Sequence, residues 1–94
     1  MTITKNDTNV LAIEGRIDSI TAPDFEKEVV SLGEVNEVTF DFEKVEYISS
    51  AGLRVLLKAQ KSIGKKGKVR VINANDDIKE IFEMTGFEDV ITIE

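Results

Sequence analysis

Short stretches of alternating apolar and polar residues recur along the chain, and alternation at period two is the pattern of β-strands. It is clearest at Val38-Thr39-Phe40-Asp41-Phe42. Together with intervening turn formers such as Asn6-Asp7-Thr8-Asn9, the pattern predicts five strands, over residues 2–5, 9–17, 38–42, 69–72 and 90–93. Residues 10–13 are almost continuously apolar, which is typical of a strand covered on both faces.

Between the strands, apolar residues recur at intervals of three and four, the spacing of one helix face. Pro23 suits the first turn of the first helix, and Asn75 is placed to cap the third. Gly33 and Gly86 are typical helix stops, and Phe87 is placed to pack back over the last turn of the third helix. The buried faces predicted for these two helices are Ala22, Phe25, Val29 and Leu32 in the first, and Ile78, Ile81 and Phe82 in the third.

The resulting order β-β-α-β-α-β-α-β predicts an α/β fold with a mostly parallel sheet. The chain has 94 residues, of which 41% are hydrophobic, enough for one core. No linker, repeat or low-complexity segment interrupts it. We therefore predict a single domain over residues 1–94.

The second helix begins at Ser49 or Ser50, directly after the central strand. A serine hydroxyl at a helix N-cap accepts a bond from an otherwise unpaired backbone N–H, so either serine has an ordinary structural role there. Apolar and small residues at helical spacing form the stripe that we assign to the core, namely Gly52, Val55, Leu56, Ala59 and Ile63.

A second stripe of this helix consists of Ser50, Leu53, Arg54 and Leu57, which lie a third of a turn or more away from the core stripe. Two interpretations of Leu53 and Leu57 stay open. They pack under a neighbouring helix or loop, or they form a partner-binding face with Ser50 at its edge.

Composition narrows the possible functions. The chain has no Cys and no His, which excludes thiolate chemistry, disulfides, a Ser-His-Asp nucleophile and most zinc sites. We predict no cofactor. The formal net charge of −6 disfavours nucleic acid and anionic membrane surfaces. No apolar run is long enough to cross a bilayer, so we expect a cytoplasmic protein without direct membrane insertion.

Two motifs superficially suggest other chemistry. Residues 64–68 read Gly-Lys-Lys-Gly-Lys, but the spacing of a phosphate-binding loop is absent and no helix follows, so we predict a solvated turn. Ser50-Ala51-Gly52 is similar to a nucleophile elbow, but Ile48 stands where that motif needs glycine. With no histidine base available either, we predict that the protein is not an enzyme.

The central stretch, Phe40-Asp41-Phe42, Val45 and Tyr47-Ile48-Ser49-Ser50-Ala51-Gly52-Leu53, resembles the signature of the STAS domain. This family includes anti-sigma factor antagonists and the cytoplasmic domains of sulphate transporters. The resemblance extends to Gly15-Arg16-Ile17-Asp18 and to Met84-Thr85-Gly86-Phe87, and so covers nearly the whole chain.

In bacterial antagonists of this family, an anti-sigma factor that is itself a protein kinase phosphorylates a serine or threonine at this junction. Aligning Gly52-Leu53 with the family places that residue at Ser50. Many relatives carry Asp just before it and Ser or Thr just after it, where this chain has Ser49 and Ala51. Because the Asp is missing, Ser49 stays a second candidate for the modification.

The resemblance implies a function and a set of partners. The unphosphorylated protein would bind an anti-sigma factor of the ATPase-kinase type and free its sigma factor, phosphorylation at Ser50 would abolish binding, and a serine phosphatase would reset it. The resemblance also leaves an alternative open, a docking subunit of a lipid-transporter ATPase or of a stress-sensing complex.

The partner surface expected from these considerations centres on Ser50. The resemblance places the loop around Asp18 and Ser19 beside it, although Asp18 also suits a turn or capping role. Gly52 either admits a partner backbone or permits close packing of the helix on a strand. The complete predicted surface is Asp18, Ser19, Ser49, Ser50, Gly52, Leu53, Arg54 and Leu57.

Overall fold

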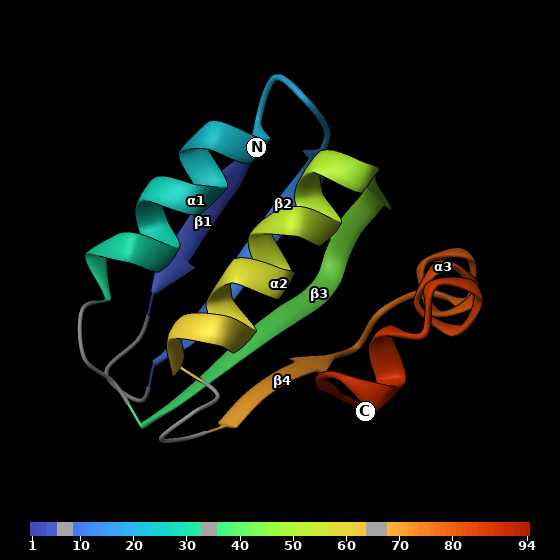
Figure 1. Cartoon of the computed structure of the whole chain (residues 1–94). Coiled ribbons are helices and arrows are strands. Elements are labelled where there is room, and N and C mark those ends of the chain that lie inside the picture. The colour runs from blue at the N-terminus through green and yellow to red at the C-terminus, as the bar shows by residue number, and fades with distance from the viewer. Residues whose placement is uncertain (6–8, 33–35, 64–67) are drawn as a thin grey trace.

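The computed structural model describes residues 1–5, 9–32, 36–63 and 68–94 (Figure 1). Its elements are β1 (Thr2–Lys5), β2 (Val10–Ile17), α1 (Ala22–Ser31), β3 (Glu37–Ile48), α2 (Ser50–Ile63), β4 (Lys68–Ile72), α3 (Asp76–Thr85), a 3₁₀ turn (Phe87–Asp89) and β5 (Thr92–Ile93). The predicted order is confirmed. The expected turn at residues 6–8, the helix stop at Gly33 and the lysine-rich turn at residues 64–67 lie outside the described residues.

The five strands form one sheet in the order β1-β2-β3-β4-β5. The pair β1–β2 is antiparallel, and the other three pairs are parallel, as predicted for a mostly parallel sheet. In the central pair, Ile17 at the end of β2 lies opposite Ile48 at the end of β3. Whatever follows these two strands therefore begins at the same edge of the sheet.

Helices cover one face of this sheet, and α1 and α2 lie side by side over it (Figure 1). The ring of Phe25 in α1 meets that of Phe40 in β3 edge-on, with centroids 5.5 Å apart. Phe42, two residues further along β3, lies 6.2 Å from Phe82 of α3. Because alternate residues of a strand point to the same side, α1 and α3 pack on the same face of the sheet.

The expectation that residues 10–13 form a strand covered on both faces is wrong. Leu11 and Ile13 are fully buried, but Ala12 and Glu14 between and after them are exposed. The helices lie on one face of the sheet in Figure 1, so no helix among the described elements covers the second face at this strand. A small residue such as Ala12 adds little apolar surface there, so its exposure costs little free energy. An apolar run that includes such a residue therefore does not require cover on both faces.

The central strand is more than twice as long as the predicted residues 38–42. Beyond Phe42, its buried residues recur every third position, at Val45 and Ile48, because two register shifts against β2 each insert an extra residue. Such bulges leave backbone groups without ladder partners. At the first bulge, the Asp41 carboxylate accepts the N–H of Glu43 at 3.0 Å. Because the bulges interrupt the alternation of buried and exposed residues, a period-two pattern does not predict the second half of the strand.

At the C-terminal end, the predicted caps are confirmed and the last strand is shorter than predicted. The Asn75 side chain accepts the N–H of Ile78 at 2.9 Å, and Gly86 ends α3 with a left-handed φ of 74°. Phe87 stacks on Phe82 with centroids 6.0 Å apart. The turn that this stacking closes takes up the start of the predicted strand 90–93, so β5 begins only at Thr92.

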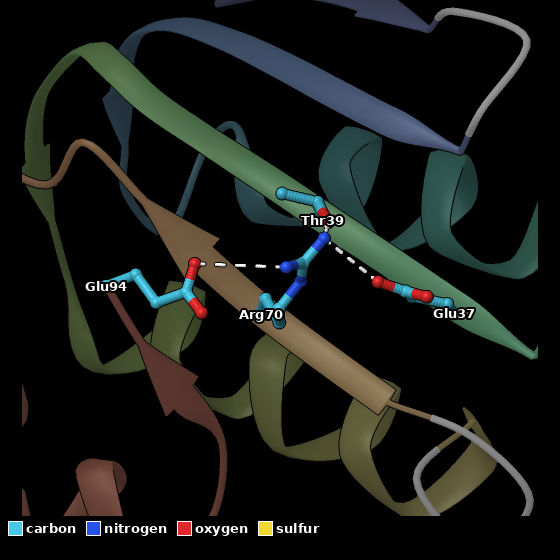
Figure 2. A network of polar contacts seen from close by, with 4 residues as sticks. All are labelled: Glu37, Thr39, Arg70 and Glu94. Carbon is cyan, nitrogen blue, oxygen red and sulfur yellow. Dashed lines mark hydrogen bonds and ion pairs between the residues drawn. The ribbon is translucent and has the colours of Figure 1, made fainter.

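On the face opposite the helices, Arg70 of β4 links the neighbouring strands (Figure 2). Its guanidinium donates to the Thr39 hydroxyl at 3.2 Å and pairs with Glu37 at 2.9 Å, both on β3. The Glu94 carboxylate lies 3.9 Å away on the other side. Thr39 is buried, whereas both carboxylates are exposed, so the hydrogen bond to Thr39 is the least screened of the three contacts.

We expect Thr39→Val to lower the free energy of unfolding by about 1 kcal/mol, because it leaves a guanidinium N–H without its buried acceptor. Glu94→Gln is the comparison, and it should cost less than about 0.5 kcal/mol because its ion pair is long and exposed. Urea denaturation measures both. Equal losses for the two variants would contradict this ranking.

Candidate functional site

The candidate site lies where β2 and β3 end side by side. The backbone N–H of Ser49 donates to the carbonyl of Ile17 at 2.8 Å, which joins the start of α2 to the end of β2. Asp18 and Ser19 follow Ile17 directly, so their loop adjoins the Ser49-Ser50 junction. The sheet register thus brings together two predicted segments that are about thirty positions apart in the sequence.

The two serines have different positions at the start of α2. Ser49 precedes the helix, and its hydroxyl accepts the N–H of Gly52 at 3.4 Å, a long capping bond. Ser50 is the first helical residue and its side chain is exposed. Within the described residues, the Ser50 hydroxyl has no hydrogen-bond partner. Of the two candidate caps, Ser49 is the one that caps the helix in the structure. The Ser50 hydroxyl is therefore not used in capping and is accessible at the surface.

Asp18 occupies the turn between β2 and α1. Its carboxylate accepts the backbone N–H groups of Ile20 at 2.9 Å and Thr21 at 3.0 Å. The Thr21 hydroxyl lies between Asp18 and the Arg16 carbonyl, to which it donates at 2.9 Å. The predicted turn role is therefore the one that the geometry supplies, and this carboxylate shapes the loop that adjoins Ser50.

The same contacts lower the pKa of the Asp18 carboxyl from its usual value near 3.8. The N–H of Thr21 contributes most, desolvation acts in the opposite direction, and the N–H of Ile20, the Thr21 hydroxyl and the charge of Arg16 lower the pKa further. Asp18 is consequently ionised at neutral pH, and its ionised form is the one that holds the loop together.

Two features of this edge were missed by sequence reasoning. The backbone N–H of Ile20 donates to the Asp18 carboxylate, and the Ile20 side chain in this turn is 83% exposed. The signal in the sequence that could have indicated this exposed residue was a single apolar residue within an otherwise polar loop. The guanidinium of Arg16 lies 4.7 Å from the ring centre of Tyr47, a cation–π contact between neighbouring strands that depends on their register.

Gly52 is buried, so the expectation that it forms part of a contact surface needs correction. A Cβ built at Gly52 would lie 2.6 Å from Cγ2 of Ile17 and 2.7 Å from Cγ1 of Ile48. Real Cβ atoms do not approach other atoms so closely. Of its two predicted roles, close helix–strand packing is the one that the structure supplies, and this packing seats the first turn of α2 on β2 and β3.

The remaining predicted residues of α2 lie at or near its surface. Leu53 and Leu57 are half-buried, and Leu53 packs against the hydrophobic core. Arg54 is exposed and has no ion pair within the described ranges. The edge around Ser50 therefore presents a free hydroxyl, an unpaired cation and partly exposed leucines.

The described residues contain neither a cluster of potential metal ligands nor a helix that could cross a membrane. No group of three or more acidic side chains is arranged there to hold a metal ion. No helix in the described ranges is both long and apolar enough to cross a bilayer.

Comparisons with known proteins point to one family. The family model of the STAS domain matches residues 1–94. The anti-sigma-B factor antagonist of Listeria monocytogenes is 34% identical over 97 residues, which cover 97% of this chain and 84% of the relative.

Solved structures share the fold. A crystal structure of an anti-sigma factor antagonist from Mycobacterium paratuberculosis matches 98% of this chain and 81% of its own, with a TM-score of 0.85 at 22% identity. The Bacillus cell fate determinant SpoIIAA in its phosphorylated form matches 99% of this chain and 89% of its own, with a TM-score of 0.72 at 14% identity. SpoIIAA, an anti-sigma factor antagonist, has also been solved unphosphorylated.

We expect Gly52→Ala to destabilise the fold by about 1–3 kcal/mol, because the new methyl group must displace Ile17 and Ile48 or lift α2 off the sheet. Ser50→Ala, two positions away on the exposed side of the helix, should stay within about 0.5 kcal/mol of the wild type. Urea denaturation followed by circular dichroism compares them. A Gly52→Ala protein as stable as the wild type would contradict the packing role.

The hydrogen bonds to the Asp18 carboxylate make the stability of the fold depend on pH. A carboxyl whose pKa is lower in the folded than in the unfolded state stabilises the fold above its unfolded pKa, and that stabilisation disappears as the pH falls through the folded value. Asp18→Asn should therefore be less stable than the wild type at pH 7, and the difference should shrink below pH 4. Urea denaturation across this range measures it.

Glu46→Gln is the matched control for that series. Glu46 is exposed, and its carboxylate has no hydrogen bond or ion pair among the described residues. Its variant should show no comparable pH-dependent difference from the wild type. If the cost of Asp18→Asn were the same at pH 3 as at pH 7, the carboxylate would not act through its charge.

Proposed function

The chain belongs to the STAS domain family, and from this membership and the geometry at Ser50 we propose that it is an anti-sigma factor antagonist controlled by phosphorylation of Ser50. The unphosphorylated protein binds an anti-sigma factor, which thereby releases its sigma factor. The anti-sigma factor is also the serine kinase that modifies Ser50, and a serine phosphatase reverses the modification. The role is one of binding, without catalysis by this chain.

The observation that carries the proposal is the exposed Ser50 hydroxyl, which has no hydrogen-bond partner in the described structure. A kinase needs a hydroxyl that it can reach and deprotonate. The neighbouring Ser49 hydroxyl is less suitable, because it is half-buried and accepts the N–H of Gly52. This difference favours Ser50 over Ser49 as the site of modification.

The position of Ser50 also suits a switch that leaves the domain folded. A phosphoserine adds nearly two negative charges and three acceptor oxygens. At the first residue of α2, those charges lie near unpaired backbone N–H groups and the positive end of the helix dipole, both of which stabilise an anion. The folded domain therefore tolerates the phosphate, while a partner surface that fits the neutral serine does not.

The proposed contact surface surrounds Ser50. It includes Ser19 from the loop that Asp18 holds, and Ser49, Leu53, Arg54 and Leu57 from the start of α2 and the residue before it. The similarity to curated anti-sigma factor antagonists supports the proposed role of the chain as an antagonist. So does the likeness in fold to SpoIIAA, which has been solved in both unphosphorylated and phosphorylated forms.

The test uses the wild type, Ser50→Ala and Ser50→Asp as paired baits in lysate of the native host, with retained proteins identified by mass spectrometry. We expect the wild type and Ser50→Ala to retain a small kinase-like ATPase, and Ser50→Asp to lose at least about nine-tenths of it. Incubating the purified pair with ATP should place one phosphate on the wild type at Ser50 and none on Ser50→Ala.

Ser31→Asp is the matched control, because it adds the same charge at an exposed serine at the far end of α1. It should capture the partner like the wild type. Equal capture by Ser50→Asp and the wild type would disprove the switch. A transporter ATPase retained equally by every bait would instead identify the protein as a docking subunit and return Ser50 to a structural role.

A further inference from the structure

A groove runs between α1 and α2 on the outer side of the helix layer. Its first part, of about 190 Å³, begins at Ser19 and Ala51, next to the Ser50 junction. Its second part, of about 370 Å³, continues to Ile63 at the far end of α2. The two parts share Glu26, Val55 and Lys58, so they adjoin one another between α1 and α2, which lie side by side in Figure 1.

The floor of this α1–α2 groove is apolar. Val29, Val55 and Ile63 line it and are mostly buried. Val30 lines it as well and is 73% exposed. Val30 is therefore the apolar side chain at the groove that a partner can cover to the greatest extent, and the buried residues beneath it form an apolar base.

The rim is basic, although the whole chain carries a net charge of −6. Helix α2 contains Arg54, Lys58 and Lys61 and no acidic residue, and all three cations line the groove. Glu26 is the acidic residue that lines it in the described structure, and it pairs with Lys58 at 2.6 Å. Arg54 and Lys61 have no ion pair within the described ranges.

We propose that the α1–α2 groove binds an acidic amphipathic helix of a protein partner, in addition to the contact at Ser50. An apolar floor with a cationic rim is complementary to a helix that presents leucine-like side chains on one face and carboxylates beside them. The 14 residues of α2 extend over about 21 Å, which matches a partner helix of about four turns. This inference rests on the proposed function only in naming the anti-sigma factor as that partner.

The place of the groove explains how one phosphate could act on it. Its first part opens beside the Ser50 junction, and Arg54 lies one helical turn from Ser50. A dianionic phosphoserine at position 50 lies within a Debye length of Arg54 and opposes the field that attracts an acidic helix. The groove therefore loses its charge complementarity at the end nearest the modification.

The test uses a defined probe and the full ¹⁵N-labelled chain. The probe is a synthetic peptide of about 16 residues, with leucines on one helical face and glutamates on the others. We expect it to perturb the amide signals of Val30, Val55 and Lys61 in a saturable, salt-sensitive titration. The same peptide with lysines in place of glutamates should bind at least about tenfold more weakly. Equal binding of the two peptides, no binding, or perturbations confined to another face would overturn the proposal.

Variants at exposed positions locate the binding. Val30→Asp and Lys61→Glu should each lower the affinity for the acidic peptide at least about fivefold. Val30→Asp removes the apolar contact, and Lys61→Glu reverses a charge on the rim. Lys79→Glu makes the same charge change on α3, outside the groove, and should bind like the wild type. Circular dichroism checks that all three variants are folded. If Lys79→Glu weakened binding as much as Lys61→Glu, net charge rather than the groove would explain the effect.

These outcomes are separable from those of the Ser50 test. If the acidic peptide occupies the groove but no anti-sigma factor is captured from lysate, the groove assignment stands and the proposed function fails. If the anti-sigma factor is captured and the peptide does not bind at the groove, the proposed function stands and the groove assignment fails.

Discussion

The arrangement depends on how closely the first turn of α2 is attached to the ends of β2 and β3. One hydrogen bond, from the Ser49 N–H to the Ile17 carbonyl, continues the strand pairing by one residue beyond the sheet. Directly afterwards, the absence of a side chain at Gly52 lets the helix rest on Ile17 and Ile48. Because α2 is held at its first turn, everything on its surface has a fixed position relative to the Asp18 loop, and a charge added at Ser50 has defined neighbours.

The loop beside that turn is held by electrostatics rather than by packing. The ionised Asp18 carboxylate gathers the N–H groups of Ile20 and Thr21, and this leaves Ser19 and Ile20 at the surface. The junction thus combines an apolar anchor at Gly52 with a polar anchor at Asp18. Neither anchor involves the hydroxyl of Ser50, which stays exposed at the junction between them.

Much of this fold follows from local pattern, and the parts that do not are those set by neighbouring strands. The order of the elements, the Asn75 cap and the Gly86 stop depend on short-range spacing and were predictable. The long β3 was not, because its two bulges arise from its register against β2. Similarly, the choice between Ser49 and Ser50 as cap, and between the two roles of Gly52, required the position of Ile17, which lies more than thirty residues earlier. The groove could not be predicted from the sequence either, because it exists only where α1 and α2 lie side by side.

Helix α2 is the element on which both proposed contacts converge. One of its flanks carries Leu53 and Leu57, and the flank facing α1 carries Lys58 and the groove, with Arg54 on the ridge between them. Both flanks begin at the first turn of the helix, where Ser50 is exposed, so a partner that contacts Leu53 and the start of the groove lies close to Ser50. Under these two proposals, the energetic effect of a phosphate at Ser50 is not confined to one lost contact, because the phosphate lies beside the leucines and also opposes the positive field at the entrance of the groove. A single modification at the exposed Ser50 hydroxyl, which has no hydrogen-bond partner among the described residues, can in this way control a surface much larger than the serine itself.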